Sequence, residues 1–167
     1  MEAETKDHLR SVVADAAVSG SAASILSAAV LSTLSKVQEG SAAGGLNAPS
    51  QWVWGRQAGY SREPSMRQTA LGFAIHHATS VFWATFYEHF FGRTRNNRTD
   101  RIPTGQIVLE AVGMATAAYV VDYGLTPKRF QPGFEKHVSP GGMVAIYAAF
   151  AAGLALATLS RRRTASE

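Results

Sequence analysis

The stretch SPGGMVAIYAAFAAGLALATLS, residues 139–160, has 22 residues with no Asp, Glu, Lys or Arg and is followed directly by Arg161, Arg162 and Arg163. At a helical rise of about 1.5 Å per residue, a stretch of this length spans a bilayer core about 30 Å thick. Arginines directly after an apolar helix are typical of its cytoplasmic end. The stretch therefore predicts a transmembrane helix.

Three further stretches of the chain are similarly poor in charge. The windows 16–35, 68–87, 102–121 and 139–160 together hold 82 of the 167 residues but one formal charge, Glu110. Helices of a soluble bundle need a polar stripe that faces water, and these windows have none. We therefore expect an all-α integral membrane protein, one domain over residues 1–167, with four transmembrane helices in an antiparallel bundle. The expected helices cover about residues 12–35, 68–91, 103–124 and 139–160.

The first expected helix, residues 12–35, is the least apolar of the four. It contains six serines and Asp15, so a helix lying on a membrane surface is an alternative. Its second half carries Ile25, Leu26 and Leu31, which favour a crossing. Small residues also allow close helix contacts in lipid.

The basic residues predict the orientation in the membrane. Residues 92–101 contain four arginines, and three more follow the last helix, so both segments are expected in the cytoplasm together with the N-terminus. The first ten residues mix both charges and lack the pattern of a cleaved signal peptide. The chain has no cysteine, which excludes disulfides and thiolate ligands.

Five ionisable residues are expected at membrane depth, where such groups are costly and usually functional. They are His76, His77, Glu88, Glu110 and Asp122. If the second and third helices are antiparallel neighbours, depth counting brings one of the histidines to Asp122 near the outer surface and Glu88 to Glu110 near the inner one. The hypothesis is a proton or small-solute relay. The structural alternative is a buried hydrogen bond that fixes the helix hairpin.

Other classes of site have less support in the sequence. Adjacent histidines on a helix point about 100° apart, so His76 and His77 are not expected to bind one metal ion together. An axial haem pair would need a histidine on a facing helix, which only a second copy of the chain could supply. Phosphate-binding loops and the motifs of zinc and serine hydrolases are absent, so we predict no cofactor and find no support for an enzyme. Basic clusters beside membrane helices indicate topology and anionic lipid rather than nucleic acid.

Two stretches carry a resemblance to a known group: HHATSVFWA, residues 76–84, through Glu88, and VDYGLTPKR, residues 121–129. They resemble small bacterial inner-membrane proteins and are more distantly similar to the YagU-like group, which also has a histidine-bearing helix and a later Gly-Leu-Thr-Pro. The resemblance implies a bacterial inner membrane and no particular mechanism. The expected partners are the lipid bilayer and a second copy or a larger membrane complex. An accessory subunit of such a complex is therefore the alternative function.

Overall fold

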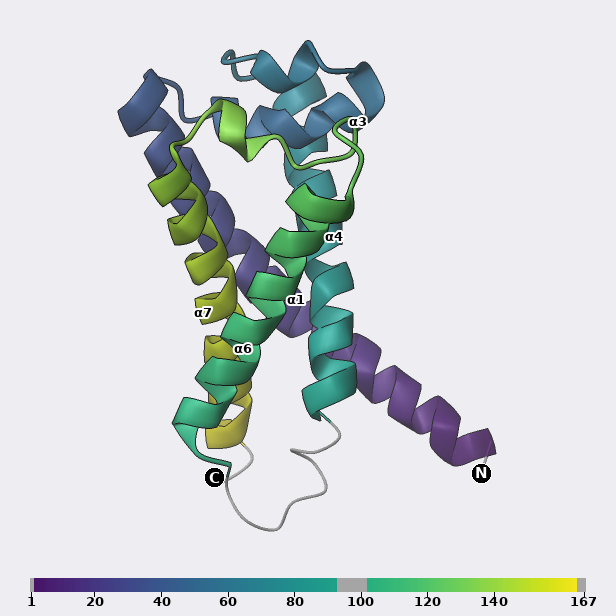
Figure 1. Cartoon of the computed structure of the whole chain (residues 1–167). Helices are drawn as coiled ribbons and strands as arrows, with labels where there is room; N and C mark the ends of the chain where they lie inside the picture. The colour runs from purple at the N-terminus through teal and green to yellow at the C-terminus, as the bar shows by residue number, and fades with distance from the viewer. Residues whose placement is uncertain (1, 93–101, 165–167) are drawn as a thin grey trace.

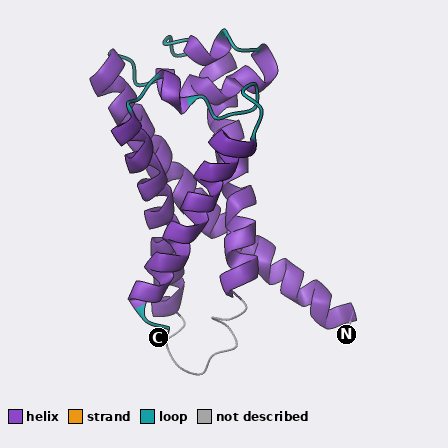
Figure 2. Ribbon diagram, viewed as in Figure 1, coloured by secondary structure: helices purple, strands orange, loops and turns teal. Residues whose placement is uncertain are grey.

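The computed structural model describes residues 2–92 and 102–164, and these residues form helices and loops with no strand among them (Figure 2). The predicted all-α class is therefore confirmed. The arginine-rich loop that supports the predicted orientation, residues 93–101, lies outside the described residues, as do the side chains of Arg162 and Arg163.

The first helix, α1, covers Glu2–Glu39 and is longer than the predicted one. In Figure 1 its first turns project away from the other helices. The helix ends at Gly40, whose φ of +79° places it in the left-handed region, where glycine lacks the steric penalty of other residues. The Gly40 amide donates to the Lys36 carbonyl at 3.0 Å.

The second long helix begins at Ser65, whose hydroxyl accepts a hydrogen bond from the Gln68 amide at 3.0 Å. Its central part, α4, covers Leu71–Tyr87. A π-helical turn extends it at each end, Met66–Ala70 and Glu88–Gly92. The predicted helix over residues 68–91 is therefore present.

The other two long helices match their predicted ranges closely. Helix α6 covers Thr104–Val120 and continues through the π-helical turn Val121–Leu125. Pro103 directly precedes α6, and Pro140 is the first residue of α7, which covers Pro140–Thr164. Both positions suit proline, because the first helical amides have no partner within the helix.

Three of these helices are long and apolar enough to cross a membrane: His8–Glu39, Thr104–Leu125 and Pro140–Arg161. They correspond to the first, third and fourth predicted crossings. Large apolar side chains on them face outward, with Ile25, Leu109 and Val144 each more than 60% exposed. Outward-facing side chains of this kind fit a hydrocarbon surrounding better than water.

Helix α1 packs along both α4 and α7, and α6 packs along α7. An added Cβ at Gly20 of α1 would lie 2.6 Å from the Val81 Cα of α4, and one at Gly153 of α7 would lie 2.4 Å from the Ala23 Cα of α1. These glycines let the backbones approach closely. Helices α4 and α6 share only a small contact, so the expectation that they pack as neighbours is only partly met.

A cap of loops and short helices covers one end of the bundle (Figure 1). It consists of residues 40–65 and 126–139, and its helical turns are α2 (Gly44–Asn47), α3 (Gln51–Trp54) and the 3-10 turns Ala48–Ser50, Ala58–Tyr60 and Phe134–Lys136. The two cap segments are joined by a hydrogen bond from Gln51 Nε2 to the Gln131 carbonyl at 2.6 Å. Lys136 also donates to Gln51, and burial lowers the pKa of this lysine.

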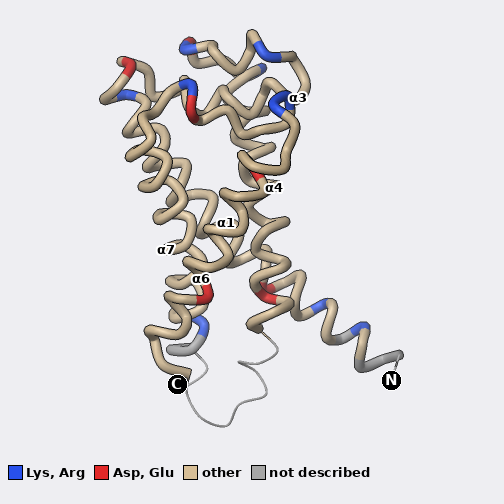
Figure 3. Tube along the Cα trace, in the orientation of Figure 1, with Lys and Arg blue, Asp and Glu red and all other residues tan. Residues whose placement is uncertain are grey.

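Charged residues gather at the cap and at the opposite end of the bundle, with few between them (Figure 3). Both chain ends lie at the end away from the cap (Figure 1). This distribution follows the predicted one, in which the middle of each helix lies in hydrocarbon.

Candidate functional site

His76 lies on α4 at its contact with α1 and is buried. Its Nε2 lies 3.0 Å from the Ser27 hydroxyl oxygen. The Ser27 hydroxyl donates to the Ala23 carbonyl at 2.7 Å, so its oxygen accepts from His76. This arrangement places a proton on Nε2 and leaves Nδ1 of the neutral ring as a proton acceptor.

Asp122 lies in the last turn of the third long helix, within the segment Val121–Leu125. The Tyr147 hydroxyl of α7 donates to Asp122 Oδ2 at 2.7 Å. The Trp83 indole of α4 lines the same cavity as this carboxylate. Asp122 therefore bonds to α7 and shares a cavity wall with α4.

His76 and Asp122 line one cavity between the helices. The other polar groups in its wall are Ser27, Thr79, Ser80, Trp83 and Tyr147. The cavity volume is about 40 Å³. Since one water molecule needs roughly 10–15 Å³ on this measure, the cavity has room for about three.

The cap closes the cavity at one end. Trp52 and Pro49 from the first cap segment and Phe134 and Pro132 from the second line its wall. The Phe134 ring meets the His76 ring edge-on, with the ring centres 5.6 Å apart. The cap therefore forms the wall of the cavity on that side.

Glu88 lies toward the opposite end of the bundle and is 1% exposed. The Arg161 guanidinium of α7 donates to Glu88 Oε1 at 2.6 Å and to the Asp15 carbonyl of α1 at 3.1 Å. Buried charges of this kind need a partner of opposite sign. Glu88 therefore belongs to an ion pair that joins three helices.

The remaining two predicted site residues lie outside the cavity wall. His77 stacks on Phe73 with ring centres 6.0 Å apart. Glu110 accepts a hydrogen bond from Gln106 Nε2 at 3.0 Å, one turn away on the same helix. Of the five predicted residues, the structure thus brings His76 and Asp122 together around one cavity.

Sequence reasoning missed three residues that matter here. Tyr147 lies in the last apolar stretch and Trp52 in the segment between the first two expected helices, and neither was singled out as a site residue. His137 was not singled out either, but it is buried in the cap, with Nδ1 2.8 Å from Glu39 Oε2 and Nε2 2.8 Å from the Gly59 carbonyl. The ring thus joins the end of α1 to both segments of the cap.

Within the two described ranges, no group of three or more His, Cys, Asp or Glu side chains is placed to hold a metal ion. Comparison with protein-family models, curated proteins and solved structures finds no match to the chain. Its function must therefore be argued from the arrangement of its own residues.

Proposed function

We propose that the chain crosses a bacterial inner membrane four times, with α4 and its two π-helical extensions as the second crossing. The support is its length: residues 66–92 form one helical segment, which at about 1.5 Å per residue is long enough to span the hydrocarbon core. An even number of crossings also agrees with the position of both chain ends opposite the cap. The basic tail after α7 favours a cytoplasmic location for that end.

Within this frame we propose that His76 and Asp122 form a relay for protons or a small solute. The observation that carries the proposal is that both residues line one cavity, which has room for water. The ring of His76 takes up a proton at Nδ1, and Asp122 takes one up at its carboxylate. Water molecules between them supply the hydrogen-bonded connection that proton movement requires.

The ion pair of Glu88 and Arg161 lies outside this cavity, nearer the other end of the bundle. Glu88 follows His76 by twelve residues on one helical segment, which is about 18 Å of rise. Ionisable groups inside a membrane are costly, so those that are present usually serve the structure or a function. A proton that reaches Glu88 lies close to the end of the bundle away from the cap.

The adjacent histidines provide a matched test of the relay. The protein is reconstituted into liposomes that enclose a pH-sensitive dye, and a potential is imposed with potassium and valinomycin. His76→Phe should reduce the proton flux toward that of empty liposomes, because it removes the cavity's imidazole. His77→Phe should leave the flux near that of the wild type, because His77 lies outside the cavity wall. Equal flux in both variants would contradict the relay.

One face of α6 favours the second candidate function, that of an accessory subunit in a larger membrane complex. Gly105 and Gly113 have no atom within 4 Å of an added Cβ, and Leu109 between them is 72% exposed. A helix of another protein can approach such a face closely. Copurification of a stoichiometric partner from native membranes, lost in a Gly113→Leu variant, would support this function. From residues 76–84 and 121–129 we also propose that the chain is distantly related to the YagU-like group.

A further inference from the structure

A second cavity lies between α6 and α7, on the other side of Tyr147 from the first. Its volume is about 470 Å³, within the range of roughly 300–1,000 Å³ that is usual for ligand pockets. Val112, Met143 and Ala148 contribute apolar wall, and Val112 and Val144 at its edges are exposed. Both helices are long and apolar enough to cross a membrane, so this groove opens toward the hydrocarbon.

Three tyrosines form the wall of the groove nearest the cap. The Tyr119 ring lies 5.4 Å from Tyr123 and 5.2 Å from Tyr147, the latter edge-on. Tyr147 lines both cavities, and its hydroxyl donates to Asp122. The groove is therefore separated from the Asp122 carboxylate by one side chain.

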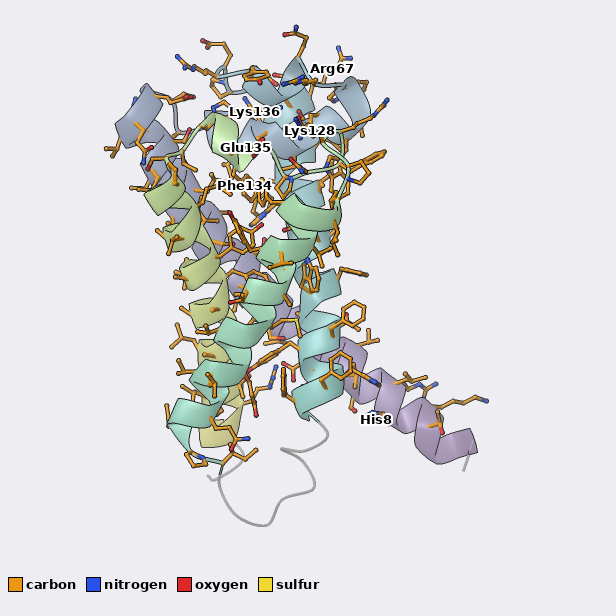
Figure 4. The ribbon with its side chains drawn as sticks, in the orientation of Figure 1. His8, Arg67, Lys128, Phe134, Glu135 and Lys136 are labelled. Atoms are coloured by element: carbon orange, nitrogen blue, oxygen red, sulfur yellow. The ribbon has the colours of Figure 1, made fainter. Side chains whose placement is uncertain are left out.

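The one formal charge among the described residues in the wall of the groove is negative. Glu135 lines its cap end, close to the Tyr123 hydroxyl, and Figure 4 shows it beside Phe134 in the cap. No described residue in the wall of either cavity is a lysine or arginine. An anion in the groove would lie against the Glu135 carboxylate, with Asp122 behind Tyr147, whereas a cation is favoured by this charge and by the faces of the aromatic rings.

We propose that this groove binds a lipophilic organic cation, which enters sideways from the membrane between α6 and α7. The apolar wall takes up the organic groups of the ligand, and the rings of Tyr119, Tyr123 and Tyr147 surround its charge. Glu135 draws the cation to the cap end, and movement of Tyr147 opens the way to Asp122. The inference rests on the proposed function, since it names the class of solute that exchanges with the proton on Asp122.

Tetraphenylphosphonium and tetraphenylborate provide a matched pair of probes, because they have nearly the same shape and opposite charge. Binding of each to the purified full chain in lipid nanodiscs is measured by equilibrium dialysis, and binding to nanodiscs without protein is subtracted, because both ions also partition into lipid. The phosphonium should bind saturably, with one site per chain, and the borate should bind at least tenfold more weakly. Equal binding of the two ions would overturn the proposal, because it indicates simple partition into an apolar surface.

Variants of the groove locate the binding. Tyr119→Leu should weaken phosphonium binding about fivefold, since a ring facing a desolvated cation contributes about 1 kcal/mol. Glu135→Gln should weaken it about two- to fivefold. Leu109→Ala, which changes an exposed residue of α6 outside the groove, should leave binding unchanged. Full phosphonium affinity in both groove variants would also overturn the proposal.

The binding assay needs no transport, so its result is separate from that of the relay. Proton flux without selective phosphonium binding would contradict the cation site and still support the relay. Selective binding without proton flux would establish the cation site and remove the relay.

Discussion

Replacing Gly153 by alanine tests the close contact between α1 and α7. The added Cβ would lie 2.4 Å from the Ala23 Cα and 2.6 Å from the Ala23 nitrogen. Both are backbone atoms of α1, which cannot move aside as a flexible side chain does. Since ordinary contacts begin at 3.4 Å, α1 and α7 must separate locally by about 1 Å.

The free-energy cost of this separation follows from the packing contacts that it removes. A gap of about 0.5–1 Å removes a quarter to a half of the dispersion energy of the atoms that line it. Overpacking of well-packed interiors costs about 1–3 kcal/mol. We therefore expect Gly153→Ala to destabilise the fold by about 1–3 kcal/mol relative to a control that carries the same change of residue type.

Gly113→Ala is that control. Gly113 lies in α6, is exposed, and would place its Cβ in open space. Both variants gain the same helix propensity, about 1 kcal/mol for glycine to alanine, so the difference between them isolates the packing cost. Reversible unfolding in mixed micelles of a mild detergent and dodecyl sulfate, followed by tryptophan fluorescence, measures the difference. Equal stability of the two variants would refute the close approach of α1 and α7.

Three further predictions concern the ends of the bundle. Arg161→Met should destabilise the protein by about 3 kcal/mol in the same unfolding assay, because it removes the guanidinium that donates to the buried Glu88, and adding Glu88→Gln should restore part of the loss. His137→Gln should cost about 1–3 kcal/mol, because both N–H groups of glutamine are on one nitrogen and cannot reach partners on opposite sides as the two ring nitrogens do; an unchanged midpoint would contradict the buried cap geometry. Since the chain has no cysteine, a single cysteine at exposed Lys128 should react with an impermeant maleimide in intact spheroplasts, and one at Lys6 only after permeabilisation. Reaction of both in intact cells would contradict an even number of crossings.

The helices could be predicted from the sequence because their signals are local. Charge-free length predicts the segments, and residues such as Pro103 and Pro140 indicate where helices begin. Helix neighbours were harder to predict, because in lipid they depend on shape rather than on an apolar stripe. Gly20 and Gly153 bring α1 close to α4 and α7, but small-residue spacings are frequent in any alanine-rich helix.

Part of the candidate site could also be predicted from the sequence. Counting helical rise placed His76 and Asp122 at similar depth, and they line the same cavity. The same counting paired Glu88 with Glu110, whereas the structure pairs Glu88 with Arg161 from the far end of the chain. The sequence alone could not identify Tyr147 and Trp52 as site residues, because their roles depend on how α7 and the cap pack against α4. Such long-range contacts have no signature in a single sequence.

The most direct test of the account is the proton flux through liposomes that contain Asp122→Asn. The amide keeps the size of the carboxylate and its acceptor for Tyr147, but it cannot take up a proton. The account predicts that wild-type liposomes conduct protons above the level of empty ones under an imposed potential, and that Asp122→Asn liposomes do not. Wild-type conductance equal to that of empty liposomes, or undiminished conductance in Asp122→Asn, would contradict the relay.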